Sequence, residues 1–308
     1  MIIPMPNTTT RAIVGKLVEA QEHYTLTTSR VLTLIVVLDD ATELDSVLAA
    51  VRDASHEHPS RVLVVVTSDK DSAEPFVDAQ LLVGGEAGAS EIVVMDLHGP
   101  LTQHAESVVT PLLLPDTPIV VWWPTNSPLQ PSRAPIGRLA QRRITNAAAK
   151  GDLTKLLDGY MPGDSDMAWG AITQWRGIVA SSMDRCAHES VQSVTIAGPD
   201  ESLAVELAAA WLADRLHVPV VREVTPVESN GNQLFPIQKL VITLQTAHIV
   251  IEVVDSSTVR VNVPGSPESV VALSKRNRAE ILSEELRHLD ADDAYARTLR
   301  GLAHVKHQ

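Results

Sequence analysis

The chain has 308 residues and a formal net charge of -13, and Phe, Tyr and Trp together make up only 3% of it, although hydrophobic residues make up 44%. This length predicts two domains, with cores built from Val, Leu, Ile and Ala, which suits helices packed on sheets. The acidic charge disfavours nucleic acid and an anionic membrane as partners, since both are bound through clustered Lys and Arg; it favours a partner with a basic patch.

The single cysteine, Cys186, excludes a disulfide within the chain and is expected to be a structural thiol. The opening residues, Met1 to Asn7, do not show a basic region followed by a long apolar one. No apolar run approaches the ~20 residues that span a bilayer. We therefore expect a cytoplasmic protein that is not bound to a membrane.

The first third of the chain predicts strands that alternate with helices. Residues 8–24 follow helical spacing, residues 31–38 form an apolar strand, and residues 44–51 carry apolar side chains on one helical face. Residues 62–66 are a second buried strand. A strand, a helix and a strand in so short a stretch imply a parallel pair with a right-handed crossover.

The next segments predict a hairpin and two helices. Residues 79–83 and 91–95 are strand-like on either side of the glycine-rich turn 84–88, which indicates a hairpin at the edge of the sheet. Residues 101–114 suit a helix whose last turn Pro111 breaks or kinks. A later helix is expected to carry Ile136, Leu139, Ala140 and Arg143 on one face, and Arg138, Arg142 and Lys150 on the other.

Between these helices, residues 119–124 form a short β-branched run that ends in Trp122, Trp123 and Pro124. We interpret it as a central strand. Neighbouring side chains of a strand point to opposite faces, so the two indoles cannot enter one core layer. Either each indole enters a separate core face, or one is buried and the other faces a crevice or a partner.

The second half begins after a linker at residues 160–166. A helix is expected at 167–187, a strand at 191–197 and a helix from Pro199, and residues 267–303 are expected to be helical. Four strand-like runs lie between them and predict an antiparallel meander, at residues 218–224, 240–245, 249–254 and 259–263.

These elements predict an α/β fold of two domains. The first, residues 1–160, has a mostly parallel sheet covered by helices. The second, residues 166–308, has a mixed or antiparallel sheet with helices.

For each candidate catalytic motif, a structural explanation is favoured over a catalytic one. The glycines at 84–88 connect two strands and open no helix, so they do not suit a pyrophosphate. His56 and His58 lie where a helix ends and point about 200° apart on a helix of ~3.6 residues per turn, which disfavours a metal site. We expect no cofactor and no bound metal.

Several stretches resemble one family. They are His58-Pro59-Ser60-Arg61, Val120-Val121-Trp122-Trp123-Pro124, Gly137-Arg138-Leu139-Ala140, Arg142-Arg143-Ile144, Asp166-Met167-Ala168-Trp169 and Trp175-Arg176. In this order they are similar to the glucose-6-phosphate dehydrogenase assembly protein (OpcA) family. The second half is more loosely similar, through its Pro199-Asp200 helix, its strand meander and its charged end.

The resemblance implies a non-enzymatic protein that binds glucose-6-phosphate dehydrogenase, helps its oligomer to assemble or persist, and raises its activity in the oxidative pentose phosphate pathway. Some relatives are linked to thiol regulation of the dehydrogenase, but with one cysteine an internal dithiol switch is impossible here.

The motifs do not say which residues touch the dehydrogenase. Trp and Arg dominate interface hot spots, so the candidates for protein binding are Trp122, Trp123, Arg61, Arg142, Arg143, Trp175 and Arg176. The rival interpretation makes the tryptophans core residues and pairs the arginines with acids inside the protein. A different function, a sugar-phosphate or nucleotide-binding enzyme with its site at the carboxyl ends of the first domain's strands, stays open as the alternative.

Overall fold

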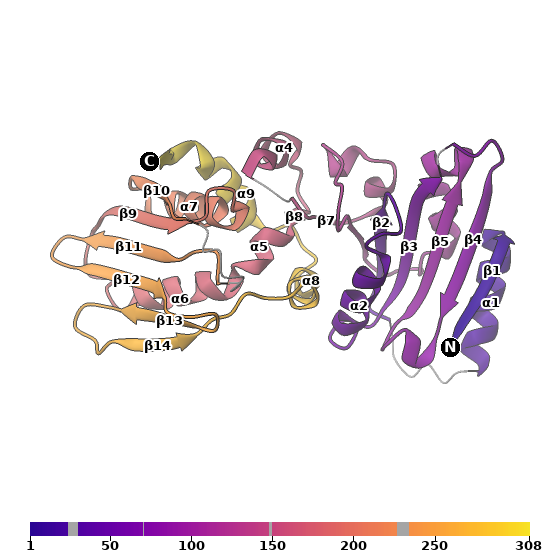
Figure 1. The fold of residues 1–308 in the computed structure, drawn as a ribbon, viewed down its shortest axis with the longest axis horizontal. Helices are drawn as coiled ribbons and strands as arrows, with labels where there is room; N and C mark the ends of the chain where they lie inside the picture. The colour runs from indigo at the N-terminus through magenta and orange to yellow at the C-terminus, as the bar shows by residue number, and fades with distance from the viewer. Residues whose placement is uncertain (24–29, 70, 148–149, 227–233) are drawn as a thin grey trace. The chain divides into compact units, whose positions relative to one another are not determined.

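In the computed structural model, β-branched runs form the strands of two sheets, and amphipathic helices pack on them (Figure 1). The structure describes residues 1–23, 30–69, 71–147, 150–226 and 234–308. One sheet has 8 strands and the other has 7 among the described residues. The chain forms two units, and segments of the sequence alternate between them. The first unit takes residues 1–146, 159–167 and 278–291, and the second takes residues 147–158, 168–277 and 292–308.

The first sheet has the order β1-β4-β5-β3-β2-β6-β7-β8. Its strands are β1 (Ile2–Thr8), β2 (Leu32–Leu38), β3 (Ser60–Asp69), β4 (Phe76–Leu82), β5 (Glu91–His98), β6 (Ile119–Trp122), β7 (Arg142–Thr145) and β8 (Asp164–Asp166). The six strands from β5 to β8 are parallel, and β4 and β1 join antiparallel at one edge. The predicted parallel pair 31–38 and 62–66 is confirmed by the register of β2 and β3.

Helices cover both faces of this sheet, so its central strands are apolar on both sides. On one face α2 (Leu44–Ala54) packs with α8 (Arg278–Arg287), which comes from the far end of the sequence. On the other face lie α1 (Thr10–His23), α3 (Ala105–Val109) and short 3-10 turns, including η3 (Thr110–Leu112) and η5 (Ile136–Leu139). The apolar spacing of α2 matches this burial, since Val47, Leu48 and Val51 are all buried.

The second sheet has the order β14-β13-β12-β11-β9-β10-β15. Its strands are β9 (Val191–Gly198), β10 (Val220–Val224), β11 (Lys239–Leu244), β12 (His248–Val253), β13 (Thr258–Asn262), β14 (Ser269–Ala272) and β15 (Val305–His307). Helix α7 (Leu203–Leu216) connects the parallel pair β9 and β10. The remaining helices in this half of the chain are α4 (Leu153–Gly159), α5 (Met167–Ala171), α6 (Thr173–Asp184) and α9 (Asp293–Gly301).

The meander prediction is confirmed for three of its four strands and wrong for one. β11, β12 and β13 pair antiparallel, and β14 extends the meander by one strand. β10 instead pairs parallel with β9 and with β15. The crossover through α7 imposes this direction, and the strand, helix and strand expected over residues 191–224 already carried that signal. The mixed sheet agrees with the expected fold class.

Three local predictions are also wrong. Arg142 and Arg143 lie on strand β7 and not on a helix, because hydrogen bonding to β6 outweighs the helical spacing of this segment. Residues 101–114 are not one helix, because the non-helical backbone of His104 separates the 3-10 turn Gly99–Gln103 from α3; the break expected at Pro111 is confirmed, since α3 gives way there to η3. Residues 269–272 are strand β14 within the stretch expected to be helical.

The linker expected at 160–166 ends in β8, the last strand of the first sheet. The division into residues 1–160 and 166–308 stays a prediction. Among the described residues, no helix is both long enough and apolar enough to cross a bilayer.

Candidate functional site

The two indoles at the tip of β6 enter opposite core faces. Trp122 is 0% exposed and packs in the cluster with Val120, Ile144 and α8, whereas Trp123 is 4% exposed and packs in the cluster beneath α1 and α3. The alternation of a strand therefore places one indole in each core layer. The expectation that at least one indole is buried is confirmed. Any contact of Trp122 or Trp123 with a partner stays a prediction.

The loop over Trp123 fits only glycine at position 137. A Cβ added at Gly137 would lie 1.9 Å from the carbonyl oxygen of Pro131 and 3.2 Å from the Trp123 ring. The Gly137-Arg138-Leu139-Ala140 motif therefore lets η5 approach the backbone of the preceding loop and cover the indole.

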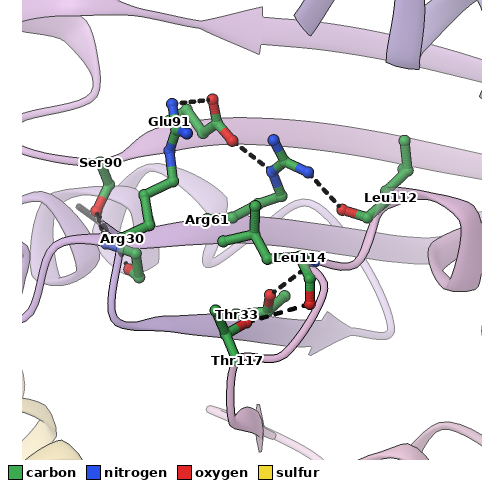
Figure 2. A network of polar contacts seen from close by, with 9 residues as sticks. Arg30, Thr33, Arg61, Ser90, Glu91, Leu112, Leu114 and Thr117 are labelled. Atoms are coloured by element: carbon green, nitrogen blue, oxygen red, sulfur yellow. Dashed lines mark hydrogen bonds and ion pairs between the residues drawn. The ribbon is translucent and has the colours of Figure 1, made fainter. Parts of the chain in front are cut away.

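Arg61 belongs to a buried polar network at the amino ends of the parallel strands (Figure 2). Its Nε donates to Oε1 of Glu91, and its Nη1 donates to the carbonyl oxygen of Leu112 at 3.0 Å. Nη2 of Arg30 lies 2.6 Å from the other carboxylate oxygen of Glu91. Burial lowers the pKa of Arg30 from its ordinary value, as does the charge of Arg61, while Glu91 acts in the opposite direction.

Strand starts position these three residues. Arg61 and Glu91 are paired neighbours in the register of β3 and β5, and Arg30 comes two residues before β2. Doubly wound sheets bind ligands at the opposite, carboxyl ends of their strands. The network therefore holds together the amino ends of these strands. The guanidinium groups of Arg30 and Arg61 are both paired with Glu91.

Arg142 and Arg143 point to opposite faces of β7, and each meets its own carboxylate. Nη2 of Arg142 donates to Oε2 of Glu285 on α8 at 2.7 Å, and its Nη1 donates to the carbonyl oxygen of Asp290 at 3.1 Å. Nε of Arg143 donates to Oδ1 of Asp164 on β8. Both guanidinium groups are buried, so these pairs join β7 to its neighbours within the first unit.

Asp164 is held by donors on both of its oxygens. The backbone N–H of Met161 donates to Oδ2 at 2.8 Å, while Arg143 donates to Oδ1. Burial raises the pKa of Asp164 above its ordinary value, although the hydrogen bond and the charge of Arg143 act against this.

Trp175 and Arg176 lie on α6 in the second unit. Trp175 is 1% exposed and meets Trp211 of α7 edge-on, with ring centroids 6.1 Å apart. The guanidinium carbon of Arg176 lies 3.5 Å from the centroid of Trp169, which is a cation–π contact. Arg176 is partly exposed, unlike the other six candidates.

Trp169 connects this contact to the start of α9. Its indole Nε1 donates to Oδ2 of Asp292 at 2.7 Å, and Oδ1 of Asp292 accepts the backbone N–H groups of Ala294 and Tyr295 at 2.8 and 2.9 Å. Burial alone would raise the pKa of Asp292, but these donors and the charge of Arg176 outweigh it and hold the pKa below its usual value. Asp292 is therefore the N-cap of α9 and the anchor of Trp169.

The carboxyl ends of the first sheet were the expected place for a ligand in the enzyme alternative. The parallel strands follow the order of a dinucleotide-binding fold, with the switch point between β2 and β6. At that point Nδ2 of Asn126 donates to Oδ2 of Asp39 at 2.9 Å, and Asp40 accepts the N–H of Thr42 at 2.7 Å. The side-chain and backbone hydrogen bonds from Thr42 lower the pKa of the exposed Asp40. Two carboxylates here disfavour a phosphate.

His58 and the thiol of Cys186 have structural surroundings. Nε2 of His58 lies 2.9 Å from the carbonyl oxygen of Ser283 on α8. No group of three or more metal-ligating side chains occurs among the residues that the structure describes. Cys186 is buried, in agreement with the expectation of a structural thiol.

Two family models match consecutive parts of the chain. One, described as the glucose-6-phosphate dehydrogenase subunit N-terminal domain, matches residues 51–159, and the other, described as the C-terminal domain of the same subunit, matches residues 162–299. The chain belongs to the OpcA family. The resemblance in the sequence motifs is thereby confirmed. A comparison with the curated proteins finds no match.

Two solved structures are similar over most of the chain, at low scores. An oxidoreductase from Sinorhizobium meliloti is 8% identical, with a TM-score of 0.41 over 90% of this chain and 95% of its own. A biliverdin reductase from Synechocystis sp. PCC 6803, solved with biliverdin and NADP+, is 11% identical, with a TM-score of 0.38 over 90% of this chain and 97% of its own. Neither likeness bears on the function of this OpcA family member.

Sequence reasoning identified the arginines and tryptophans but missed the acids that hold them. Glu91, Asp164 and Glu285 each follow their arginine by 21 to 143 residues, a separation that no local pattern spans. A second missed group lies in the other unit, where the buried Glu206 of α7 meets Arg222 of β10 and His307 of β15. An acid on the otherwise apolar face of α7 was the available signal.

Proposed function

We propose that this protein is a non-enzymatic assembly factor and allosteric activator of glucose-6-phosphate dehydrogenase. It binds the active oligomer of the dehydrogenase, stabilises it, and so supports NADPH supply by the cytoplasmic oxidative pentose phosphate pathway. One observation carries the proposal: two family models named for a subunit of that enzyme match the chain one after the other, over residues 51–159 and 162–299.

The geometry of the candidate residues supports a role in binding protein over a role in chemistry. The arginines that could have held a sugar phosphate are paired with carboxylates, as Arg61 is with Glu91 and Arg142 with Glu285. Leaving one member of a buried ion pair alone is costly, so these guanidinium groups are not readily released to a ligand. The acidic chain also suits a partner with a basic patch and not a nucleic acid.

The seven candidate residues have different roles in this proposal. Arg176 is partly exposed and is the candidate for direct contact with the dehydrogenase. The other six, Trp122, Trp123, Arg61, Arg142, Arg143 and Trp175, are buried, and in this proposal they hold the fold of their own unit.

Activation requires that the protein bind the active form of the dehydrogenase better than the inactive form. The coupling is reciprocal, so glucose 6-phosphate must tighten the complex by the same factor by which the protein raises the affinity for glucose 6-phosphate. A coupling of about 1–3 kcal/mol would correspond to a factor of roughly 5–150.

The test is a titration of the purified protein into purified dehydrogenase at sub-saturating glucose 6-phosphate, with the mass of the mixture followed by light scattering. We expect a complex of fixed stoichiometry and a lowered KM or a raised kcat. A complex without any kinetic change would reduce the role to a scaffold. The absence of a complex would overturn the proposal.

The alternative is a sugar-phosphate or nucleotide-binding enzyme, and the strand order of the first sheet is the observation in its favour. Asp39 and Asp40 at the turn after β2 are unfavourable for the phosphate that such a ligand carries. Turnover of a sugar phosphate by this chain alone would establish the alternative.

A further inference from the structure

Helix α6 leaves one of its sides exposed. Trp175, Val179 and Ser182 are buried on its inner side, whereas Gln174, Gly177 and Ser181 are exposed on the other. Spacings of three and four residues place these exposed positions together along the helix. The side of α6 around Gly177 is therefore a surface on which another molecule can lie.

A hollow opens on each flank of this surface, and both lie within the second unit. The larger hollow has a volume of about 500 Å³ and lies between α6, α7 and the start of α9, with Val179, Met183 and Leu212 in its mostly apolar lining. The smaller has a volume of about 350 Å³ and lies between α6 and strands β13 and β14. Gly177 lines both hollows, which makes it the low ridge between them.

The charge around the hollows is opposite to that of the chain. The chain has 38 acidic and 25 basic residues apart from histidine. The charged residues lining the hollows are three arginines, Arg176, Arg185 and Arg215, and one acid, Asp184. Arg185 and Arg215 are exposed. This surface is thus complementary to an acidic segment of a partner, in contrast to the acidic rest of the chain, which suits a basic patch.

The fold of this chain does not require a glycine at position 177. A Cβ added there meets no atom within 4 Å. Glycine within a helix costs about 0.5–1 kcal/mol relative to alanine, and here no internal packing compensates for that cost. A glycine between two hollows lets the backbone of a partner approach α6 closely, because no side chain stands in the way.

We propose that the dehydrogenase docks an acidic amphipathic helix across Gly177, with apolar side chains in the two hollows and carboxylates beside Arg185 and Arg215. This inference rests on the proposed function, because that function supplies the partner. An amphipathic helix lying in an apolar groove is a recurring mode of recognition. Arg176, held against Trp169, fixes one wall of the larger hollow.

The test uses the full chain and purified dehydrogenase, with the dissociation constant measured by biolayer interferometry. Gly177→Gln raises the ridge by adding a side chain to it. Because Gln is a better helix former than Gly, this substitution should not lower the thermal midpoint of the protein. We expect Gly177→Gln to weaken the complex about ten-fold, and Arg215→Glu to weaken it by a similar factor, most strongly at low salt.

Gly15 of α1 provides the matched control. It is also exposed within a helix, and a Cβ added there also meets nothing within 4 Å. Gly15→Gln makes the same change in the first unit and should leave the dissociation constant unchanged.

Failure of the docking surface and failure of the function give different results. If the wild-type chain forms no complex with the dehydrogenase, both proposals fall. If the wild-type chain binds and Gly177→Gln binds equally well, only the docking surface is overturned. If the wild-type chain forms a dimer by itself and Gly177→Gln dissociates it, the occupant is a second copy of this chain and the proposed occupant is wrong.

Discussion

Each buried arginine of the first unit is neutralised by a carboxylate from a different element. Arg143 shows the arrangement in full: Asp164 lies opposite it on β8, and the carbonyl oxygens of Ala140 and Pro162 accept from Nη1 and Nη2. A buried guanidinium that donates a hydrogen bond from each of its three nitrogens is a rigid connector between elements. These arginines therefore hold the strands and α8 of the first unit together, and any contact of theirs with a partner stays a prediction.

Trp123→Ala is expected to lower the free energy of unfolding by about 3–5 kcal/mol, because it removes an indole that is 4% exposed. Urea denaturation followed by circular dichroism measures this change. Leu129→Ala is the control, since Leu129 is 66% exposed and its truncation should have little effect. A Trp123→Ala protein with unchanged stability but a weakened dehydrogenase complex would show that Trp123 belongs to the interface and not to the core.

The opposite directions of the two indoles could be predicted from the sequence, because the alternation of side chains along a strand is a local property. The sequence did not reveal that both directions lead into core, since that depends on α8, whose Leu282 and Leu286 reach this sheet from the end of the chain. The same limit applies to the acid partners of the arginines. A charge on its own predicts that a partner exists but does not identify it.

At the scale of elements, the ends of helices were harder to predict than their faces. The expected helix at 167–187 is two helices, with Ile172 between α5 and α6 in a conformation that does not continue the helix. Helical spacing continues through this break, so periodicity alone does not detect it. Trp169, on the short helix before the break, donates to Asp292, a residue that is distant in the sequence.

The start of α9 should make stability depend on pH through Asp292. Its pKa is lowered in the folded state, so its contribution is fully present above the unfolded value near ~4 and is lost as the pH falls through the folded value. Asp292→Asn retains a residue that can cap the helix but removes the charge. Wild type should therefore be more stable than Asp292→Asn at pH 7, and the difference should shrink below about pH 4.

Thermal unfolding of both proteins between pH 7 and pH 3.5 measures this difference. Asp293→Asn is the control, because it removes one charge from the same helix start at an exposed position. An equal pH dependence for Asp292→Asn and Asp293→Asn would mean that helix charge alone, and not the hydrogen bonds to Asp292, sets the effect.

At the scale of the whole molecule, the first unit is completed by a segment, residues 278–291, that follows most of the second unit in the sequence. α8 packs against α2, and its Glu285 neutralises the buried Arg142. The alternation of strands and helices predicted two α/β domains, and the fold class is confirmed. Sequence patterns could not assign α8 to the first sheet, because an amphipathic helix shows which of its faces is apolar but not which sheet covers that face.

A fragment of residues 1–167 should therefore fold poorly on its own. It retains every strand of the first sheet but lacks α8, so the apolar side of α2 and the guanidinium of Arg142 lose the helix that covers them. We expect broad thermal unfolding and binding of the dye ANS, which reports exposed apolar surface. A peptide of residues 278–291 added in excess should sharpen the transition and raise its midpoint with peptide concentration, because it binds only the folded fragment. The same peptide with Leu282→Asp should not, since Leu282 is 0% exposed in the intact chain. A fragment that unfolds cooperatively at the wild-type midpoint without peptide would show that α8 contributes nothing to the stability of this unit.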